Sequence, residues 1–159
     1  MKALSVQQPW ALLLLTLADP ADPIKPLKPV ENRTWELPAN MYGQRVLIHA
    51  GLKMDTIPMA DLEEFMTPEQ RNRIQPDLLQ MYYYYLANEK DNAALRRSGW
   101  FGCIMGETDI VAQVTSHPSP FFSGPYGFLT RRPVLYPADK RIPCRGQLGF
   151  FDVNLEVKS

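Results

Sequence analysis

Segments with strand character occupy both ends of this chain, and one long helical stretch lies between them. Residues with high β propensity recur in six segments, at 2–6, 30–35, 44–50, 102–112, 124–129 and 147–153. Residues 57–97 have helical character instead. Strands in two groups with helices between them predict an α+β fold, and glycines in the 102–112 segment permit the bend that a barrel requires.

A short buried helix is predicted directly after the first strand. Pro9 suits a first helical turn, and Leu12 to Leu15 are apolar on every side of a helix. Such a helix has no solvent-facing side, so we expect it to plug one end of the sheet. The prolines of residues 19–29 then predict an extended loop before the second strand.

The central helical stretch has a clear helix-start signal. Thr67 is a favourable N-cap, Pro68 suits the first helical position, and Gln70 stands at the capping-box position. We expect residues 54–98 to be a helical insertion in a single domain that spans residues 1–159, since no linker divides the chain.

Composition narrows the classes of function. Hydrophobic residues make up 45% of the 159 residues and the formal net charge is zero, which argues against binding nucleic acid by bulk charge alone. No apolar run reaches the roughly 20 residues that span a bilayer, so we expect a cytoplasmic protein with no membrane partner. Cys103, Cys144, His49 and His117 are isolated in sequence, and we expect neither a metal site nor a cofactor.

Three charged residues form the densest polar cluster in an apolar neighbourhood. Glu31 and Arg33 project to the same face of an extended segment, and the long side chain of Lys28 can reach them. A buried lysine crowded by a guanidinium has a depressed pKa and can act as an acid, base or nucleophile. An ordinary ion-pair network uses the same residues, so both interpretations stay open.

The chain resembles the ASCH family in four ordered blocks. Lys28, Glu31 and Arg33 match the GxKxxExR signature of that family, although Pro26 replaces the glycine. The other matching blocks are residues 4–11, residues 45–50 with the bend at 102–111, and residues 124–128 with 145–150. The 54–98 segment has no match.

This resemblance implies a PUA-like β-barrel with a cleft beside the first helix, in a family that binds RNA. It places Lys28, Glu31 and Arg33 in the cleft, with Gln8 and Trp10 as neighbours. The expected partner is an RNA or a modified nucleoside, and Pro26 is expected to reshape the cleft entrance because proline fixes φ near −65°.

One branch of the family is an amidohydrolase that removes the acetyl group of N4-acetylcytidine with a lysine, a threonine and a glutamate. Lys28 matches the lysine, Glu31 stands in the place of the threonine, and Glu107 is the candidate for the glutamate. Lysine and glutamate together can support acyl transfer, so an amidohydrolase is one alternative to a binding protein.

Two further sets of residues support non-amidohydrolase alternatives. A reader of RNA or nucleosides would use Arg33 for phosphates, Trp10 or Tyr126 for stacking, and the basic segment 131–145 for the RNA backbone. A metal-independent ribonuclease would use His49 or Tyr126 as base, with Lys28 near the phosphate. The oligomeric state is left open.

Overall fold

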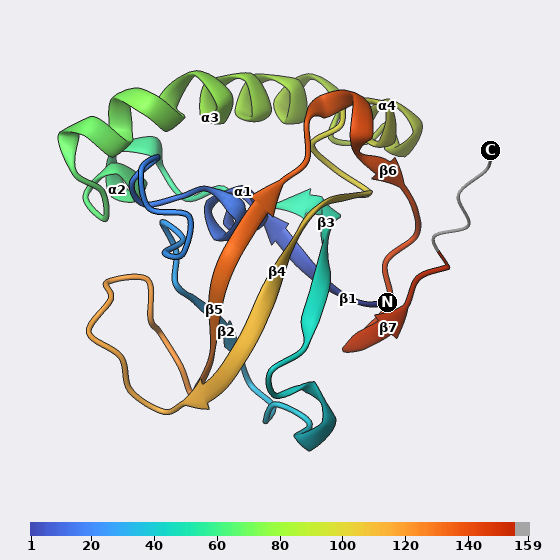
Figure 1. The fold of residues 1–159 in the computed structure, drawn as a ribbon. Coiled ribbons are helices and arrows are strands. Elements are labelled where there is room, and N and C mark those ends of the chain that lie inside the picture. Colours follow the sequence, from blue (N-terminus) through green and yellow to red (C-terminus); the bar gives the residue numbers. More distant parts are fainter. Residues whose placement is uncertain (155–159) are drawn as a thin grey trace.

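A computed structural model describes residues 1–154, and these residues form one curled, mixed β-sheet covered by helices (Figure 1). Six strands follow one another in the order β2-β5-β4-β3-β1-β7, and the short β6 pairs with β4. The strands are β1 (Lys2–Gln8), β2 (Val30–Arg33), β3 (Arg45–Met54), β4 (Cys103–Val114), β5 (Tyr126–Leu135), β6 (Ile142–Pro143) and β7 (Phe150–Asp152).

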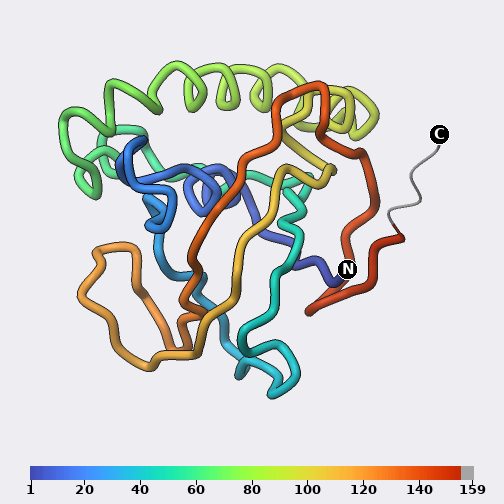
Figure 2. The backbone as a smooth tube through the Cα atoms, viewed as in Figure 1, coloured from blue at the N-terminus to red at the C-terminus, as the bar shows by residue number. Residues whose placement is uncertain are grey.

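The first strand lies inside the sheet, between two strands from later parts of the chain. β1 runs parallel to β3, with Ser5 opposite His49, and antiparallel to β7, with Lys2 opposite Asp152. The trace in Figure 2 accordingly brings the N-terminus beside the end of β7. Two side chains far apart in sequence, Ser5 and His49, therefore become direct neighbours.

The sheet is a half-barrel, because no β-ladder joins β2 to β7 within residues 1–154. Aromatic packing fills the open side instead. Phe150 of β7 lies edge-on to Trp35, just after β2, with ring centroids 5.9 Å apart, and stacks on Phe128 of β5 at 6.2 Å. The predicted α+β class and curved sheet are confirmed, whereas a closed barrel ladder is not observed in this part of the chain.

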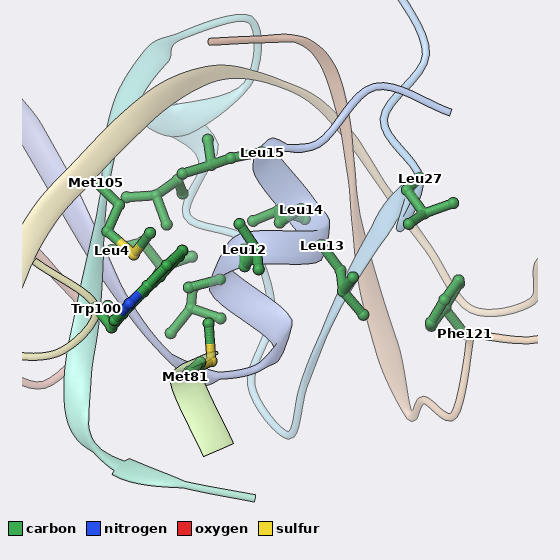
Figure 3. Packing of buried hydrophobic residues seen from close by; sticks show 14 of the residues in the cluster. Leu4, Leu12, Leu13, Leu14, Leu15, Leu27, Met81, Trp100, Met105 and Phe121 are labelled. Atoms are coloured by element: carbon green, nitrogen blue, oxygen red, sulfur yellow. The ribbon is translucent and has the colours of Figure 1, made fainter. Parts of the chain in front are cut away.

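The predicted plug helix is α1 (Trp10–Leu15), and Leu12 to Leu15 have at most 2% exposure. Figure 3 shows these leucines pointing to different sides of α1, amid Met81, Met105, Leu27 and Phe121. A helix that is apolar all round is buried all round. The helix therefore lies in the core, and the cleft described below opens beside its first residue, Trp10.

The central stretch forms α2 (Met59–Glu63), α3 (Pro68–Asn88) and α4 (Asn92–Arg97), between β3 and β4. The predicted capping box is present: Gln70 N donates to Thr67 Oγ1, and Thr67 N donates to Gln70 Oε1. The helical insertion is thus confirmed. In Figure 1 the long α3 lies across one end of the sheet. The remaining helical turns are the 3₁₀ segments η1 (Ala39–Met41) and η2 (Ala138–Lys140).

Across residues 1–154, every helix is too short or too polar to traverse a lipid bilayer.

Candidate ligand-binding cleft

Lys28, Glu31 and Arg33 meet at the start of β2, as their spacing predicts. Lys28 Nζ donates to Glu31 Oε1 at 2.9 Å and to the Val30 carbonyl oxygen at 2.6 Å. Arg33 Nη2 donates to Glu31 Oε2 at 2.8 Å and to the Ser5 carbonyl oxygen at 2.7 Å. Each carboxylate oxygen of Glu31 is thus paired with one cationic side chain. Arg33 also links β2 to β1 through its hydrogen bond to Ser5.

This ionic trio, Lys28, Glu31 and Arg33, is withdrawn from water to different degrees. The side chains of Lys28 and Glu31 are 3% and 8% exposed, and that of Arg33 is 20% exposed. Burial by itself raises the pKa of the Glu31 carboxyl, but the charges of Lys28 and Arg33 and their hydrogen bonds outweigh it and hold the pKa below 4.5. Glu31 is therefore ionised at neutral pH, and two cations share one anion.

The depressed pKa of Glu31 predicts an acid-dependent contribution to stability. Well above its ordinary pKa of 4.5, the carboxyl is ionised in the folded and unfolded states, and its contribution is complete. As the pH falls below 4.5, the unfolded state binds the proton first and the contribution is lost. Urea unfolding at a series of pH values should therefore show the largest destabilisation by Glu31→Gln above pH 5 and a shrinking one below pH 4.5. A pH-independent difference between the two proteins would contradict this.

The trio lies in the wall of a cleft of about 1550 Å³. Side chains from β1, α1, β2, β3, α4, the 120–123 loop and the 144–149 loop surround it. Typical small-molecule sites have volumes of roughly 300–1,000 Å³. The cleft is therefore wide enough for a ligand larger than a single nucleoside.

Positive charge predominates in this cleft. Its lining includes the two carboxylates Glu31 and Asp55 and five cationic side chains: Lys28, Arg33, Lys53, Arg96 and Arg145. Glu31 is already paired with two of the cations, and Asp55 Oδ2 accepts a hydrogen bond from Trp10 Nε1 at 3.1 Å. The excess of positive charge favours an anionic ligand.

Two tryptophans flank the ionic trio. Lys28 Nζ lies 5.9 Å from the centroid of the Trp10 ring, and Arg33 Cζ lies 5.7 Å from that of Trp35. Both rings are partly exposed and line the cleft. Aromatic faces beside cations are the arrangement that binds bases and phosphates together. The prediction that Trp10 lies beside the trio is confirmed.

One donor of Arg33 is left unused. Both hydrogen bonds of its guanidinium come from Nη2, and the buried Nε has no hydrogen-bond partner in the described residues. A buried donor without a partner costs about 1–3 kcal/mol. Nε is closed to solvent, so a ligand would contact the exposed part of the guanidinium, whose side chain is 20% exposed.

His49 also lines the cleft, with only 2% of its surface exposed. Its Nδ1 lies 2.9 Å from Ser5 Oγ, and its Nε2 lies 2.8 Å from the Cys144 carbonyl oxygen. Burial lowers the pKa of His49, the hydrogen bond to Cys144 raises it, and the charge of Arg96 lowers it further, so the pKa falls below 6.5. The imidazole is therefore neutral at pH 7.

Three sequence-predicted site residues lie outside the cleft lining. Gln8 is fully buried, and its side chain bonds the Trp100 carbonyl oxygen, the Met105 sulfur and the Leu12 amide. Its contacts make it part of the core rather than of the ligand surface.

Glu107 does not join the ionic trio. Its carboxylate accepts hydrogen bonds from Arg45 Nε and from Tyr136 Oη, its partner in the β3–β4 pairing is Leu47, and it is not part of the cleft lining. Tyr126, the third such residue, pairs with Arg33 in the β2–β5 ladder, but its side chain is not part of the lining.

The basic segment 131–145 does not form one surface. Arg145 is exposed and lines the cleft, whereas Arg141 lies 4.8 Å over the Trp100 ring. Arg131 and Arg132 lie elsewhere, beside Arg45 and Asp109. Of the five basic residues in this segment, only Arg145 lines the cleft.

Ser5, Trp35 and Arg96 are cleft residues that sequence reasoning missed. Ser5 stands within the 4–11 block that resembles the ASCH family, and Trp35 follows two residues after Arg33 of the signature, which was the available signal. Arg96 belongs to the helical insertion, and only the tertiary fold brings it beside His49. Within residues 1–154, no three His, Cys, Asp or Glu side chains are grouped as a metal site requires.

No protein-family model matches this chain, and no curated protein is similar to it in sequence at a significant level.

Proposed function

We propose that the cleft binds single-stranded RNA or a modified nucleoside within it. The observation that carries the proposal is the ionic trio between Trp10 and Trp35, in a cleft where cations outnumber carboxylates. Bases stack on aromatic rings, phosphates bind arginine, and both features lie side by side here. The partly exposed guanidinium of Arg33 supplies N–H donors for a phosphate or carbonyl oxygen.

Binding is a better match to Lys28 than catalysis by its amine. Lys28 is 3% exposed, and its amine already donates to a carboxylate and to a carbonyl oxygen, which hold it in place away from a reacting atom. Glu107, the proposed second member of an amidohydrolase pair, is bound to Arg45 and Tyr136 outside the cleft lining. The ionic trio therefore has the properties of a fixed recognition element.

We also propose that the chain is an ASCH domain with a PUA-like fold. Support comes from the sequence blocks and from two features that the family fold requires: a curled sheet with a helix directly after its first strand, and a cleft beside that helix. The family assignment explains why Lys28, Glu31 and Arg33 occur together in this segment.

Fluorescence anisotropy with labelled single-stranded RNA tests the binding. Arg145 and Arg131 are a matched pair, since both are exposed arginines but only Arg145 lines the cleft. Arg145→Ala should weaken binding about 10-fold and reduce the slope of log K against log salt by about one, because one phosphate contact is lost. Arg131→Ala should change binding less than 2-fold.

Replacing Trp10, one of the two tryptophans that line the cleft, separates the contribution of base stacking to RNA affinity from that of electrostatics. Trp10→Ala should weaken RNA binding by about 1–3 kcal/mol and leave the salt slope unchanged, because stacking involves no counterion release. Equal losses for Arg145→Ala and Arg131→Ala, with no effect of Trp10→Ala, would contradict binding in the cleft. Turnover of N4-acetylcytidine that Lys28→Ala abolishes would favour the amidohydrolase instead.

A further inference from the structure

A serine, a histidine and a carbonyl group are aligned in the same cleft. Ser5 and His49 are registered opposite each other on the parallel strands β1 and β3, which brings Ser5 Oγ within 2.9 Å of His49 Nδ1. On the other side of the ring, Nε2 lies 2.8 Å from the Cys144 carbonyl oxygen. Serine hydrolases arrange three groups in the same order: a nucleophile, a base, and a group that orients the base.

The carbonyl group determines the tautomer of the imidazole. A carbonyl oxygen only accepts hydrogen bonds, so Nε2 carries the proton that is donated to Cys144. In a neutral ring Nδ1 is then the acceptor, and the hydroxyl of Ser5 donates to it. The arrangement therefore leaves a basic nitrogen directed at a hydroxyl proton.

The charged and titratable groups around His49 keep the ring neutral. Burial and the nearby Arg96 of α4 both disfavour an imidazolium, and the lowered pKa is the result. The 144–149 loop contributes Cys144 and Arg145 to the same cleft, and the His49 and Phe151 rings form a T-shaped pair with centroids 5.9 Å apart. A carboxylate that would favour the protonated ring is absent from His49's contacts in residues 1–154.

Glycine at position 146 packs directly against the pair. A Cβ atom at this position would lie 2.8 Å from His49 Cε1, 3.0 Å from His49 Nδ1 and 3.1 Å from Ser5 Oγ. Ser5 itself is partly exposed and lines the cleft. A side chain at position 146 would therefore displace the pair, and a substrate has to reach Ser5 from its exposed side in the cleft.

A donor for a developing oxyanion lies next to the serine. Arg33 Nη2 is hydrogen-bonded to the carbonyl oxygen of Ser5, and the guanidinium is 20% exposed and lines the same cleft. A cationic donor beside a nucleophile is the kind of group that stabilises a tetrahedral intermediate.

We propose that Ser5 is an acyl-accepting nucleophile, that His49 is its general base, and that the cleft hydrolyses a carboxylic ester. As Ser5 Oγ bonds to the carbonyl carbon, its proton passes to His49 Nδ1 and the carbonyl electron pair moves to the oxygen, beside Arg33. Collapse of this intermediate breaks the bond to the alcohol, which leaves with the proton from Nδ1. Water then attacks the acyl-serine with the same proton transfers, and it releases the acid and restores Ser5.

The substrate class follows from the charge of the cleft. Three cations that have no ion-pair partner among residues 1–154 line the same cleft as Ser5: Lys53, Arg96 and Arg145. An ester carried by an anionic alcohol matches this surface, and a nucleotide acylated on a ribose hydroxyl is such an ester. The nucleotide part rests on the proposed function, whereas the chemistry of Ser5 and His49 does not.

A fluorophosphonate probe tests the nucleophile independently of RNA binding, because it modifies an activated serine directly. Wild-type protein should be labelled, and peptide mass spectrometry should locate the label on Ser5. Ser5→Ala, which removes one oxygen, should abolish labelling, and His49→Ala should slow it about 100-fold or more, the lower end of a general base's contribution. Ser116→Ala is the control, since Ser116 is exposed and lies outside the cleft lining.

Hydrolysis of adenosine 5′-monophosphate acetylated on the ribose tests turnover. Ser5→Ala and Gly146→Ala should each remove hydrolysis, the second because its methyl group displaces His49. Both variants should keep the circular dichroism spectrum of the wild type. Folded wild-type protein that binds RNA but is neither labelled nor active would overturn this proposal alone. Activity that survives Ser5→Ala would overturn it too, whichever residue is then responsible.

Discussion

Replacing Glu31 with alanine should reduce the free energy of unfolding by about 3–5 kcal/mol, the usual cost of removing one partner from a buried ion pair. Lys28 is 3% exposed and donates to Glu31 at 2.9 Å. Without the carboxylate, its ammonium group and the Arg33 guanidinium face each other with no anion between them. The mutation therefore leaves an uncompensated charge in the protein interior. Urea unfolding monitored by tryptophan fluorescence measures the loss.

Lys28→Met is the informative comparison for this prediction. Removing the lysine leaves Glu31 paired with Arg33 at 2.8 Å, so the remaining carboxylate still has a cation. We expect Lys28→Met to cost clearly less than Glu31→Ala. The double variant Lys28→Met/Glu31→Leu should also be more stable than Glu31→Ala, because a buried ion pair is replaced by apolar contacts. Equal costs for the two single variants would show that Glu31 is not the centre of the cluster.

Gly106→Ala should destabilise the protein by about 3 kcal/mol or more, at the upper end of overpacking costs. A Cβ atom at position 106 would overlap the carbonyl oxygen of Val134 on β5 and lie 2.9 Å from Leu15 Cδ1 of α1. A side chain could rotate away from such an overlap, but the Val134 oxygen belongs to the backbone. Relief requires β5 to move away from β4, which breaks part of the ladder between Gly106 and Leu135.

Gly51→Ala is the matched control in the adjacent strand. Its new Cβ would find one neighbour within 4 Å, Ser5 Oγ at the ordinary contact distance of 3.8 Å. We expect this substitution to change the free energy of unfolding by less than about 1 kcal/mol, as substitutions without a clash do. Thermal unfolding of both variants under one set of conditions makes the comparison. Similar melting temperatures would mean that the close approach of β4, β5 and α1 at Gly106 is not needed.

Local patterns predicted most of the fold because they determine local structure. The capping box at Thr67 and the all-apolar run from Leu12 to Leu15 each give one structural solution, and both are confirmed. The second half of β5 and the whole of β6 were not predicted. Pro133 and Pro143 argue against strands in sequence, yet here they lie in β5 and β6.

The candidate site was predictable only where its residues are close in sequence. The positions of Lys28, Glu31 and Arg33 in an extended segment were enough to predict their contact, because β geometry fixes which side chains share a face. The pairing of Ser5 with His49 depends on the parallel register of β1 and β3, which no local signal specifies. For the same reason sequence reasoning could not show that Gln8 and Glu107 lie outside the cleft lining.

The walls of the cleft come from segments between Ser5 and Gly149, so almost the whole chain must be folded before a ligand can bind. A bound ligand then stabilises the protein against global unfolding rather than against a local opening. At 100 times its Kd, the ligand adds about 2.7 kcal/mol to the free energy of unfolding. A rise in melting temperature is therefore a direct way to search for the natural ligand among nucleotides, short RNAs and acyl esters. Such a screen requires neither a label nor an assumption about catalysis.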